Sequence, residues 1–143
     1  MLNTSELLSL AQEFGTPMYV IDESKLDENR KEIDRAFSMA DVYVMPSVSE
    51  PFGIAPLEAI SNDVPVIISK TSGVAEVLTH ALKVDFWDTM EMANKILAVL
   101  KHPALHMTLR QHGNHEVKRF TWRDSARQCL EVYRSLMPVE LSV

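Results

Sequence analysis

One stretch of the sequence, residues 38–78, alternates twice between a short apolar run and a polar turn that opens a helix. The first apolar run is Val42–Met45, and its helix opens after Gly53. The second run is Val64–Ile68, and its helix opens at Gly73. This order is typical of a parallel sheet with crossover helices. Because ligands bind at the carboxyl ends of the strands in such sheets, both turns lie where a site is expected.

The pattern predicts an α/β fold, namely a three-layer, Rossmann-like domain with about four parallel strands and helices on both faces. The expected strands, in their expected order in the sheet, are Met18–Ile21, Val42–Met45, Val64–Ser69 and Leu82–Phe86. Capping residues and apolar spacing predict further helices. These helices are expected over residues 5–13 and 23–39, after Asp88, from Pro103 to about Lys118, and after Thr121.

Two glutamates mark the first of the two turns. Seven residues separate Glu50 in the loop from Glu58 in the helix. We expect both carboxylates to face the crevice above the strand, where they would accept hydrogen bonds from sugar hydroxyls. Free amides in the turns would hold phosphate oxygens, at Phe52, Gly53, Ile54, Ser72 and Gly73. The alternative is that Glu50 is a solvated loop residue and Glu58 a helix-surface residue, because isolated motifs often match by chance.

Residues 40–78 read ADVYVMPSVSEPFGIAPLEAISNDVPVIISKTSGVAEVL. This run resembles the donor-binding domain of retaining GT-B glycosyltransferases, in the glycogen-synthase and sucrose-synthase group. Glu50 and Glu58 match the two glutamates of that family's E-x7-E segment. The resemblance implies that Glu50 contacts hydroxyls of the donor sugar and that Glu58 contacts the ribose of the nucleotide. It also implies that the backbone of residues 52–54 lies beside the donor.

The same resemblance reaches the second turn and the tail, and covers residues 38–137. Residues 72–76, SGVAE, are similar to the family's Gly-Gly-x-x-Glu turn beside the diphosphate, with Ser72 replacing the first glycine. Asp63 stands where the family usually has glycine. In that family the domain begins with a strand, a glycine-containing turn, and an arginine and a lysine that clamp the diphosphate. We expect this sequence to lack those parts, and also the acceptor domain.

The opening segment, residues 7–37, reads LLSLAQEFGTPMYVIDESKLDENRKEIDRAF. It resembles the amino-terminal stretch of diaminopimelate decarboxylase and its fold-type III relatives, which use pyridoxal phosphate. The resemblance implies a first strand that leads into a barrel. In that family the lysine of the Schiff base lies later, on a barrel strand. We assign that role to no lysine here, including Lys70.

The two resemblances meet near residues 36–38, and we therefore interpret the chain as a chimera. Residues 1–37 form a decarboxylase-like helix–strand–helix segment, and residues 38–143 form a glycosyltransferase-like half-domain. Together they are expected to form one folded domain. The alternative interpretation is a truncated or misassembled natural gene.

Composition narrows the classes of partner. The chain has 143 residues, 46% hydrophobic and 24% charged, which is typical of one globular domain. A net charge of −6 without a large basic cluster argues against a nucleic-acid partner. No apolar run approaches the roughly 20 residues of a membrane span. The single cysteine, Cys129, suits a reducing compartment, so we expect a cytoplasmic protein.

No motif predicts a catalytic residue, a metal or a cofactor. The pairs His102/His106 and His112/His115 have spacings that suit a metal on one helical face. Neither pair has a third ligand from a carboxylate or a cysteine, so we expect no metal site.

Three hypotheses for function follow. We favour a folded chimera without turnover, because transfer needs groups that bind the transition state and the diphosphate clamp is missing. The alternative is a donor-domain fragment that binds a nucleotide or nucleotide sugar weakly through Glu50, Glu58 and the Ser72-Gly73 turn. The third is a glycosyltransferase subunit that a partner completes. Because a sheet without its original neighbours exposes an edge, we also expect a homodimer, whether edge-paired or domain-swapped.

Overall fold

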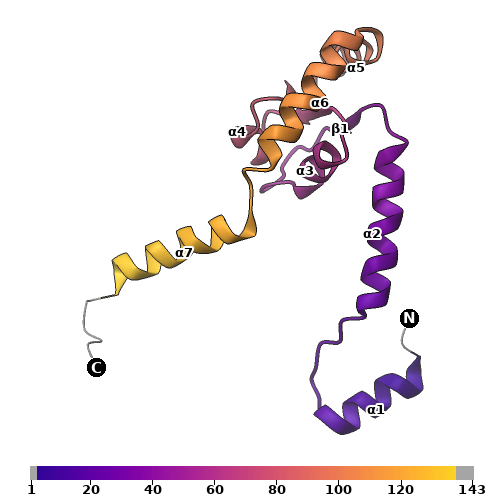
Figure 1. Cartoon of the computed structure of the whole chain (residues 1–143), viewed down its shortest axis with the longest axis vertical. Helices are drawn as coiled ribbons and strands as arrows, with labels where there is room; N and C mark the ends of the chain where they lie inside the picture. The colour runs from indigo at the N-terminus through magenta and orange to yellow at the C-terminus, as the bar shows by residue number, and fades with distance from the viewer. Residues whose placement is uncertain (1–2, 138–143) are drawn as a thin grey trace. The chain divides into compact units, whose positions relative to one another are not determined.

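The computed structural model describes residues 3–137, and the chain divides into two compact units, residues 1–39 and 40–143 (Figure 1). The first unit contains α1 (Thr4–Phe14) and α2 (Glu23–Ser38). The second contains β1 (Tyr43–Met45), α3 (Ile54–Ser61), β2 (Val66–Ser69), α4 (Val74–Val77), β3 (Leu82–Val84), α5 (Thr89–Lys101), α6 (Pro103–Val117) and α7 (Trp122–Leu136). The expected α/β class is confirmed. The assignment of residues 1–37 and 38–143 to separate origins stays a prediction.

The sheet of the second unit has three parallel strands in the order β1-β2-β3, which is the order expected for them. Tyr43 pairs with Val66 at one side of β2, and Ile67 pairs with Leu82 at the other. All four residues of β2 are buried, so both faces of the central strand are covered. A parallel strand that is buried on both faces reads as a continuous apolar run, and this is why Val64–Ile68 stands out in the sequence.

The predicted strand Met18–Ile21 is wrong. These residues are not assigned to a strand, and the exposed fraction is 102% for Tyr19 and 73% for Ile21. An apolar run becomes a strand only where a neighbouring strand accepts and donates the ladder hydrogen bonds. Within residues 3–39 the structure contains no such neighbour, so the run stays extended and unpaired.

Helices α3, α5 and α6 build the core around the sheet. Helix α3 packs against β1 and β2, α5 packs against β2 and β3, and α6 packs against both helices. Figure 1 shows α3 lying beside β1 and α6. Gly113 of α6 allows this close packing, because a Cβ atom there would lie 3.1 Å from Cγ2 of Ile60. Gly113 therefore lies at the contact between α6 and α3.

The predicted helix starts are confirmed at four caps. The Asn3 side chain accepts from the Glu6 amide, and the Glu6 carboxylate accepts from the Asn3 amide, which completes a capping box. In the same way Asp22 accepts from Lys25, Asp88 from Glu91, and Thr121 from Asp124. These local hydrogen bonds satisfy amides that have no partner inside their own helices.

A buried carboxylate of α6 anchors the turn between α4 and β3. Glu116 accepts from the amide of Thr79 at 2.8 Å, from the amide of His80 at 2.9 Å, and lies 3.1 Å from Nδ1 of His80. Burial raises the pKa of the Glu116 carboxyl, but the hydrogen bonds from His80 and Thr79 outweigh it and leave the pKa lowered. The ionised form of Glu116 is therefore part of the folded state.

Among the described residues, no helix combines the length and the apolar character that crossing a membrane requires.

Candidate functional site

Two turns meet at the carboxyl edge of the sheet. The first turn, residues 46–53, follows β1, and the second turn, residues 70–73, follows β2. Glu50 and Ser72 form a parallel β-bridge between the two turns. The Gly73 amide donates to the Glu50 carbonyl at 2.9 Å, and the Val74 amide donates to the Phe52 carbonyl at 2.7 Å. The pairing of β1 and β2 thus continues beyond the strands and joins the turns.

Hydroxyl groups add a second set of links. Thr71 Oγ1 donates to the Val48 carbonyl at 3.1 Å and lies 3.4 Å from the Ser47 carbonyl. Ser69 Oγ lies 2.8 Å from Thr71 Oγ1. Ser72 is buried, and its Oγ donates to the Ser69 carbonyl at 2.7 Å, which closes the second turn on itself.

The second turn does not offer free amides, which corrects one expectation from the sequence. The Ser72 amide donates to the Ser69 carbonyl at 3.2 Å, and the Gly73 amide donates to Glu50. Both donors are used inside the chain, since Ser69 supplies the carbonyl for the Ser72 amide and the first turn supplies the carbonyl for the Gly73 amide. Ser72 and Gly73 remain at the site, but as groups that shape it.

The first turn does offer free amides. Among residues 3–137, no acceptor takes a hydrogen bond from the amides of Phe52, Gly53 or Ile54. Gly53 caps α3 with φ at 91°, in the region that favours glycine, and Ile54 begins the helix. Amides at the start of a helix, at the positive end of its dipole, suit an anionic oxygen. The exposed fraction is 40% for Phe52 and 50% for Ile54, so this helix start is accessible.

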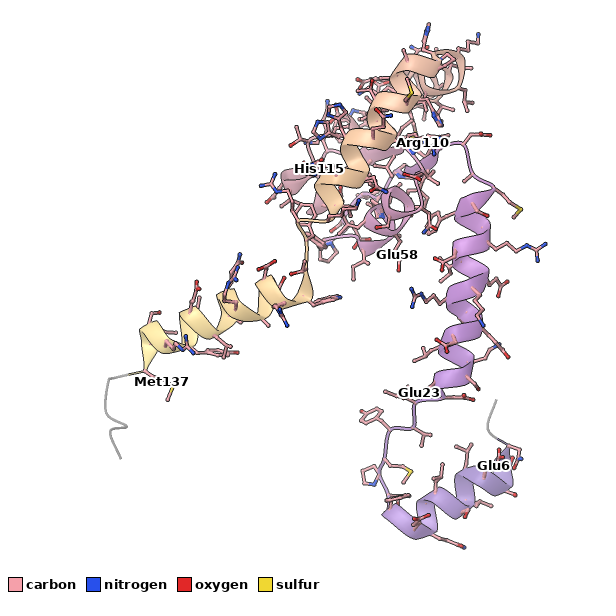
Figure 2. The ribbon with its side chains drawn as sticks, viewed as in Figure 1. Glu6, Glu23, Glu58, Arg110, His115 and Met137 are labelled. Carbon is pink, nitrogen blue, oxygen red and sulfur yellow. The ribbon has the colours of Figure 1, made fainter. Side chains whose placement is uncertain are left out.

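Both glutamates act on one phenol, which lies on β1. Glu50 is half-buried in the first turn, and Glu58 is exposed on α3 (Figure 2). Burial raises the pKa of the Tyr43 phenol, and the negative charges of Glu50 and Glu58 raise it further. The charges of both carboxylates thus reach the Tyr43 phenol, and the expectation that they face one crevice stays a prediction.

Neither of these carboxylates is neutralised. Within residues 3–137, Glu50 and Glu58 make no ion pair and no side-chain hydrogen bond. The cation that follows β2, Lys70, is held elsewhere, with Nζ 2.8 Å from Oδ2 of Asp85. The hydrogen bond to Asp85 raises the pKa of Lys70 and outweighs its burial. The two glutamates thus keep acceptor oxygens for a neutral, hydroxyl-bearing ligand.

Sequence reasoning missed three residues of this site. Tyr43 appeared only as part of an apolar run, Thr71 only as part of a polar turn, and Ser69 only as the end of a strand. A hydroxyl at the last position of a buried strand, as at Ser69, was the available signal. Buried hydroxyls need a partner, and here the partner is Thr71.

The histidine pairs of α6 do not converge on a metal. His106 Nε2 lies 3.2 Å from the Asp41 carbonyl, and the rings of His112 and His80 have centroids 5.0 Å apart. No group of three or more His, Cys, Asp or Glu residues in the described part of the chain could hold a metal ion.

Comparison with known protein families gives one match that covers most of the second unit. The sequence profile described as "Glycosyl transferases group 1" matches residues 23–116. This range contains Glu50, Glu58 and both turns. It also contains α2, which the sequence had placed in a decarboxylase-like segment.

Curated relatives cover the same part of the chain. The D-inositol 3-phosphate glycosyltransferase of Corynebacterium urealyticum is 30% identical over 115 residues, which is 77% of this chain and 27% of that protein. The mannosylfructose-phosphate synthase of Agrobacterium fabrum is 32% identical over 119 residues, which is 79% of this chain and 26% of that protein. The chain thus spans about a quarter of the length of these relatives.

Solved structures share the fold. A sucrose-phosphate synthase from Thermosynechococcus elongatus superimposes with a TM-score of 0.64 and 31% sequence identity, covering 92% of this chain and 34% of that one. The N-terminal domain of trehalose-6-phosphate phosphatase from Candida albicans gives a TM-score of 0.65 at 22% identity, which indicates a shared fold alone.

Proposed function

The chain belongs to the glycosyl transferases group 1 family, and on that premise we propose that residues 40–143 bind a nucleoside diphosphate sugar at the carboxyl ends of β1 and β2. Glu50 accepts hydrogen bonds from hydroxyls of the sugar. Glu58 accepts from the ribose of the nucleotide. The free amides at the start of α3, from Phe52 to Ile54, lie beside the diphosphate.

The observation that carries this proposal is geometric: the Glu50 side chain passes over Gly53, next to the free amides of Phe52, Gly53 and Ile54 at the carboxyl end of β1. Within residues 3–137, Glu50 and Glu58 make no ion pair, so their carboxylates form a surface of acceptors. Such a surface matches the many hydroxyl donors of a sugar and a ribose, whereas a bare phosphate would be repelled by it. The helix start of α3 supplies the complementary donors for the phosphate oxygens.

The whole protein of this family type would transfer the sugar to an acceptor, and we propose that this chain binds the donor without completing transfer by itself. A departing diphosphate gains negative charge in the transition state, so cationic groups must stabilise it there. Lys70, the cation that follows β2, is paired with Asp85. On this proposal the chain keeps donor binding, and the two turns, residues 46–53 and 70–74, bring no cation other than Lys70 to the departing diphosphate.

Calorimetric titration of the full chain tests the proposal. The ligands are uridine diphosphate, adenosine diphosphate and the glucose derivative of each. We expect millimolar binding of one nucleotide series. Glu50→Gln should weaken binding of the nucleotide sugar about tenfold and leave the nucleotide unchanged, because only the sugar contact is altered. Glu58→Gln should weaken both ligands.

Glu131→Gln is the matched control, because it removes one exposed carboxylate from α7 and leaves the site untouched. If the unmodified chain binds neither nucleotide series at millimolar concentration, the proposal is wrong. Equal losses for the nucleotide and the nucleotide sugar in Glu50→Gln would contradict the role given to Glu50.

We also propose, as a separate question of origin, that the chain is a chimera with a junction near residues 36–38, in the last turn of α2. The compact-unit boundary between Met39 and Ala40 supports this proposal, since it lies next to the expected junction at residues 36–38. The family match argues against a chimera, because it begins at residue 23 and therefore includes α2. One genome that encodes the whole sequence as a continuous reading frame would refute the chimera.

Exposed apolar side chains lead us to propose a homodimer. Tyr19 and Ile21 in the first unit and Leu136 in α7 are exposed to 102%, 73% and 75%. Covering such side chains would remove apolar surface from water, which favours association. Size-exclusion chromatography with light scattering checks the mass, and a monomer at high concentration would rule the dimer out.

A further inference from the structure

The second turn touches the first turn on both sides of Glu50. Before Glu50, Thr71 Oγ1 donates to the Val48 carbonyl at 3.1 Å. At Glu50 itself, the Gly73 amide donates to its carbonyl at 2.9 Å. After Glu50, the Val74 amide donates to the Phe52 carbonyl at 2.7 Å. The backbone that carries the Glu50 side chain is therefore held at three alternate residues, Val48, Glu50 and Phe52.

Close packing leaves this arrangement little freedom. A Cβ atom on Gly73 would lie 2.0 Å from the Pro51 carbonyl oxygen, which is far inside contact distance. A Cβ atom on Gly53 would lie 3.1 Å from Cγ of Glu50, so the glutamate side chain passes directly over that glycine. Gly73 thus lets the second turn approach Pro51 of the first turn, and Gly53 leaves room for the Glu50 side chain.

Thr71 connects this arrangement to the core. The hydroxyl of Thr71 donates to the first turn, and it lies 2.8 Å from the hydroxyl of Ser69, which is fully buried. Because a hydroxyl has one proton to donate, Ser69 supplies the proton of the bond between the two hydroxyls. Thr71 thus reaches the first turn with its side chain, at the carbonyls of Ser47 and Val48.

We propose that the second turn is a brace that holds the Glu50 carboxylate in place for the donor sugar, and that Thr71 is the positioning residue of this brace. This inference rests on the proposed function. It gives the second turn a different task from holding phosphate, because the amides of Ser72 and Gly73 already donate to Ser69 and Glu50.

The brace acts on one half of the ligand only. Glu58 lies on α3, and none of the hydrogen bonds from residues 70–74 reaches that helix. Loosening the brace therefore displaces the group that recognises the sugar and leaves the group that recognises the ribose. Thr71 consequently controls the gain in affinity that the sugar adds to the nucleotide.

The test compares Thr71→Val with Thr71→Ser in the full chain. Valine keeps the shape of threonine and removes the donor, whereas serine keeps the donor. Calorimetry measures the affinity for a nucleoside diphosphate and for its glucose derivative, with uridine and adenosine forms as probes. Thr71→Val should lose about tenfold in affinity for the sugar derivative and keep its affinity for the nucleotide. Thr71→Ser should behave as the unmodified chain.

Thr108→Val is the matched control, because Thr108 Oγ1 donates at 2.8 Å to the Ala104 carbonyl of its own helix, α6. Amide exchange at Gly73 and Val74, followed by NMR, reports the brace without any ligand, and it should accelerate in Thr71→Val. Unchanged exchange and unchanged sugar affinity would overturn the brace. Equal losses for both ligands would overturn the positioning role. Failure of the unmodified chain to bind either nucleotide would contradict the proposed function itself.

Discussion

The two compact units of this chain are stabilised in different ways. The second unit contains a strand, β2, that is buried at all four positions, with Ile67 and Ile68 fully enclosed. The first unit contains two helices in which no residue is buried. Burial of apolar surface is the main favourable term in folding, at about 1.5–3 kcal/mol for each enclosed Val, Leu or Ile. Helices α1 and α2 of the first unit gain no such stabilisation from burial, because none of their residues is buried.

Local hydrogen bonds take the place of a core in the first unit. A capping box joins Asn3 and Glu6 at the start of α1, and Asp22 caps α2. Caps and propensity alone leave short helices marginal in water. The two units thus show that a segment of this chain can form a regular helix without contributing buried apolar surface to its stability. We therefore expect a core substitution and a cap substitution to act on different units.

The largest expected effect is in β2. Ile67→Ala should lower the free energy of unfolding of the second unit by about 2–5 kcal/mol, because it leaves a cavity where the Ile67 side chain is fully enclosed. Urea unfolding with residue-resolved amide exchange measures the change. Leu26→Ala in α2 is the contrasting substitution, since Leu26 is 56% exposed. It should change the free energy by less than about 0.5 kcal/mol. Similar losses for both would erase the distinction between the units.

Glu116→Gln should have the next largest effect. Because the two amides donate to different carboxylate oxygens and glutamine keeps only one oxygen, the part-buried amide of Thr79 or of His80 loses its acceptor. The expected cost is about 1–3 kcal/mol in the stability of the second unit at neutral pH.

The effect of Glu116 depends on pH in a defined direction. Its pKa in the folded chain is lower than the ordinary value of 4.5. The stabilisation is therefore complete above the pKa of the unfolded chain, and it is lost as the pH falls through the lowered pKa of the folded chain. Unfolding at neutral and at acidic pH should show a gap between the unmodified chain and Glu116→Gln that narrows on acidification. A gap that widens would contradict the assignment.

The smallest expected effect is at the cap of α1. Asn3→Ala removes the acceptor that lies 3.0 Å from the Glu6 amide and should destabilise that helix by about 1 kcal/mol. Ser9→Ala, at an exposed position of the same helix, is the control. Helix content by circular dichroism and amide exchange in residues 4–14 measure both. Unfolding of the second unit should be unaffected, and a shared loss would show that the two units unfold together.

Local patterns predicted the parts of the fold that depend on nearby residues. The apolar runs at Val42–Met45 and Val64–Ser69 became strands, and Asp88 and Thr121 became caps. The caps depend on side chains within one turn of the chain, whereas the two strands also pair with each other. The run Met18–Ile21 has a similar composition, but strand formation also requires a neighbour, and no local pattern reports whether a neighbour is present.

The candidate site also combines features that nearby residues determine with features that depend on distant partners. Glu50 and Glu58 could be selected as candidates because the family resemblance of one strand–turn–helix segment marks both. The use of the Gly73 amide by the Glu50 carbonyl could not, since the two turns are separated by a helix and a strand. Glu116 shows the same limit, because it accepts from amides 36 and 37 residues away. Such partners become visible only once the chain is folded.

The bare α-carbon of Gly73, pressed against Pro51, has a consequence for protein engineering. The loops after β1 and β2 pack together as one structural unit, so neither can be lengthened, shortened or exchanged without the other. Anyone who wishes to transplant this recognition surface onto another scaffold must move residues 46–53 and 69–74 as a matched set.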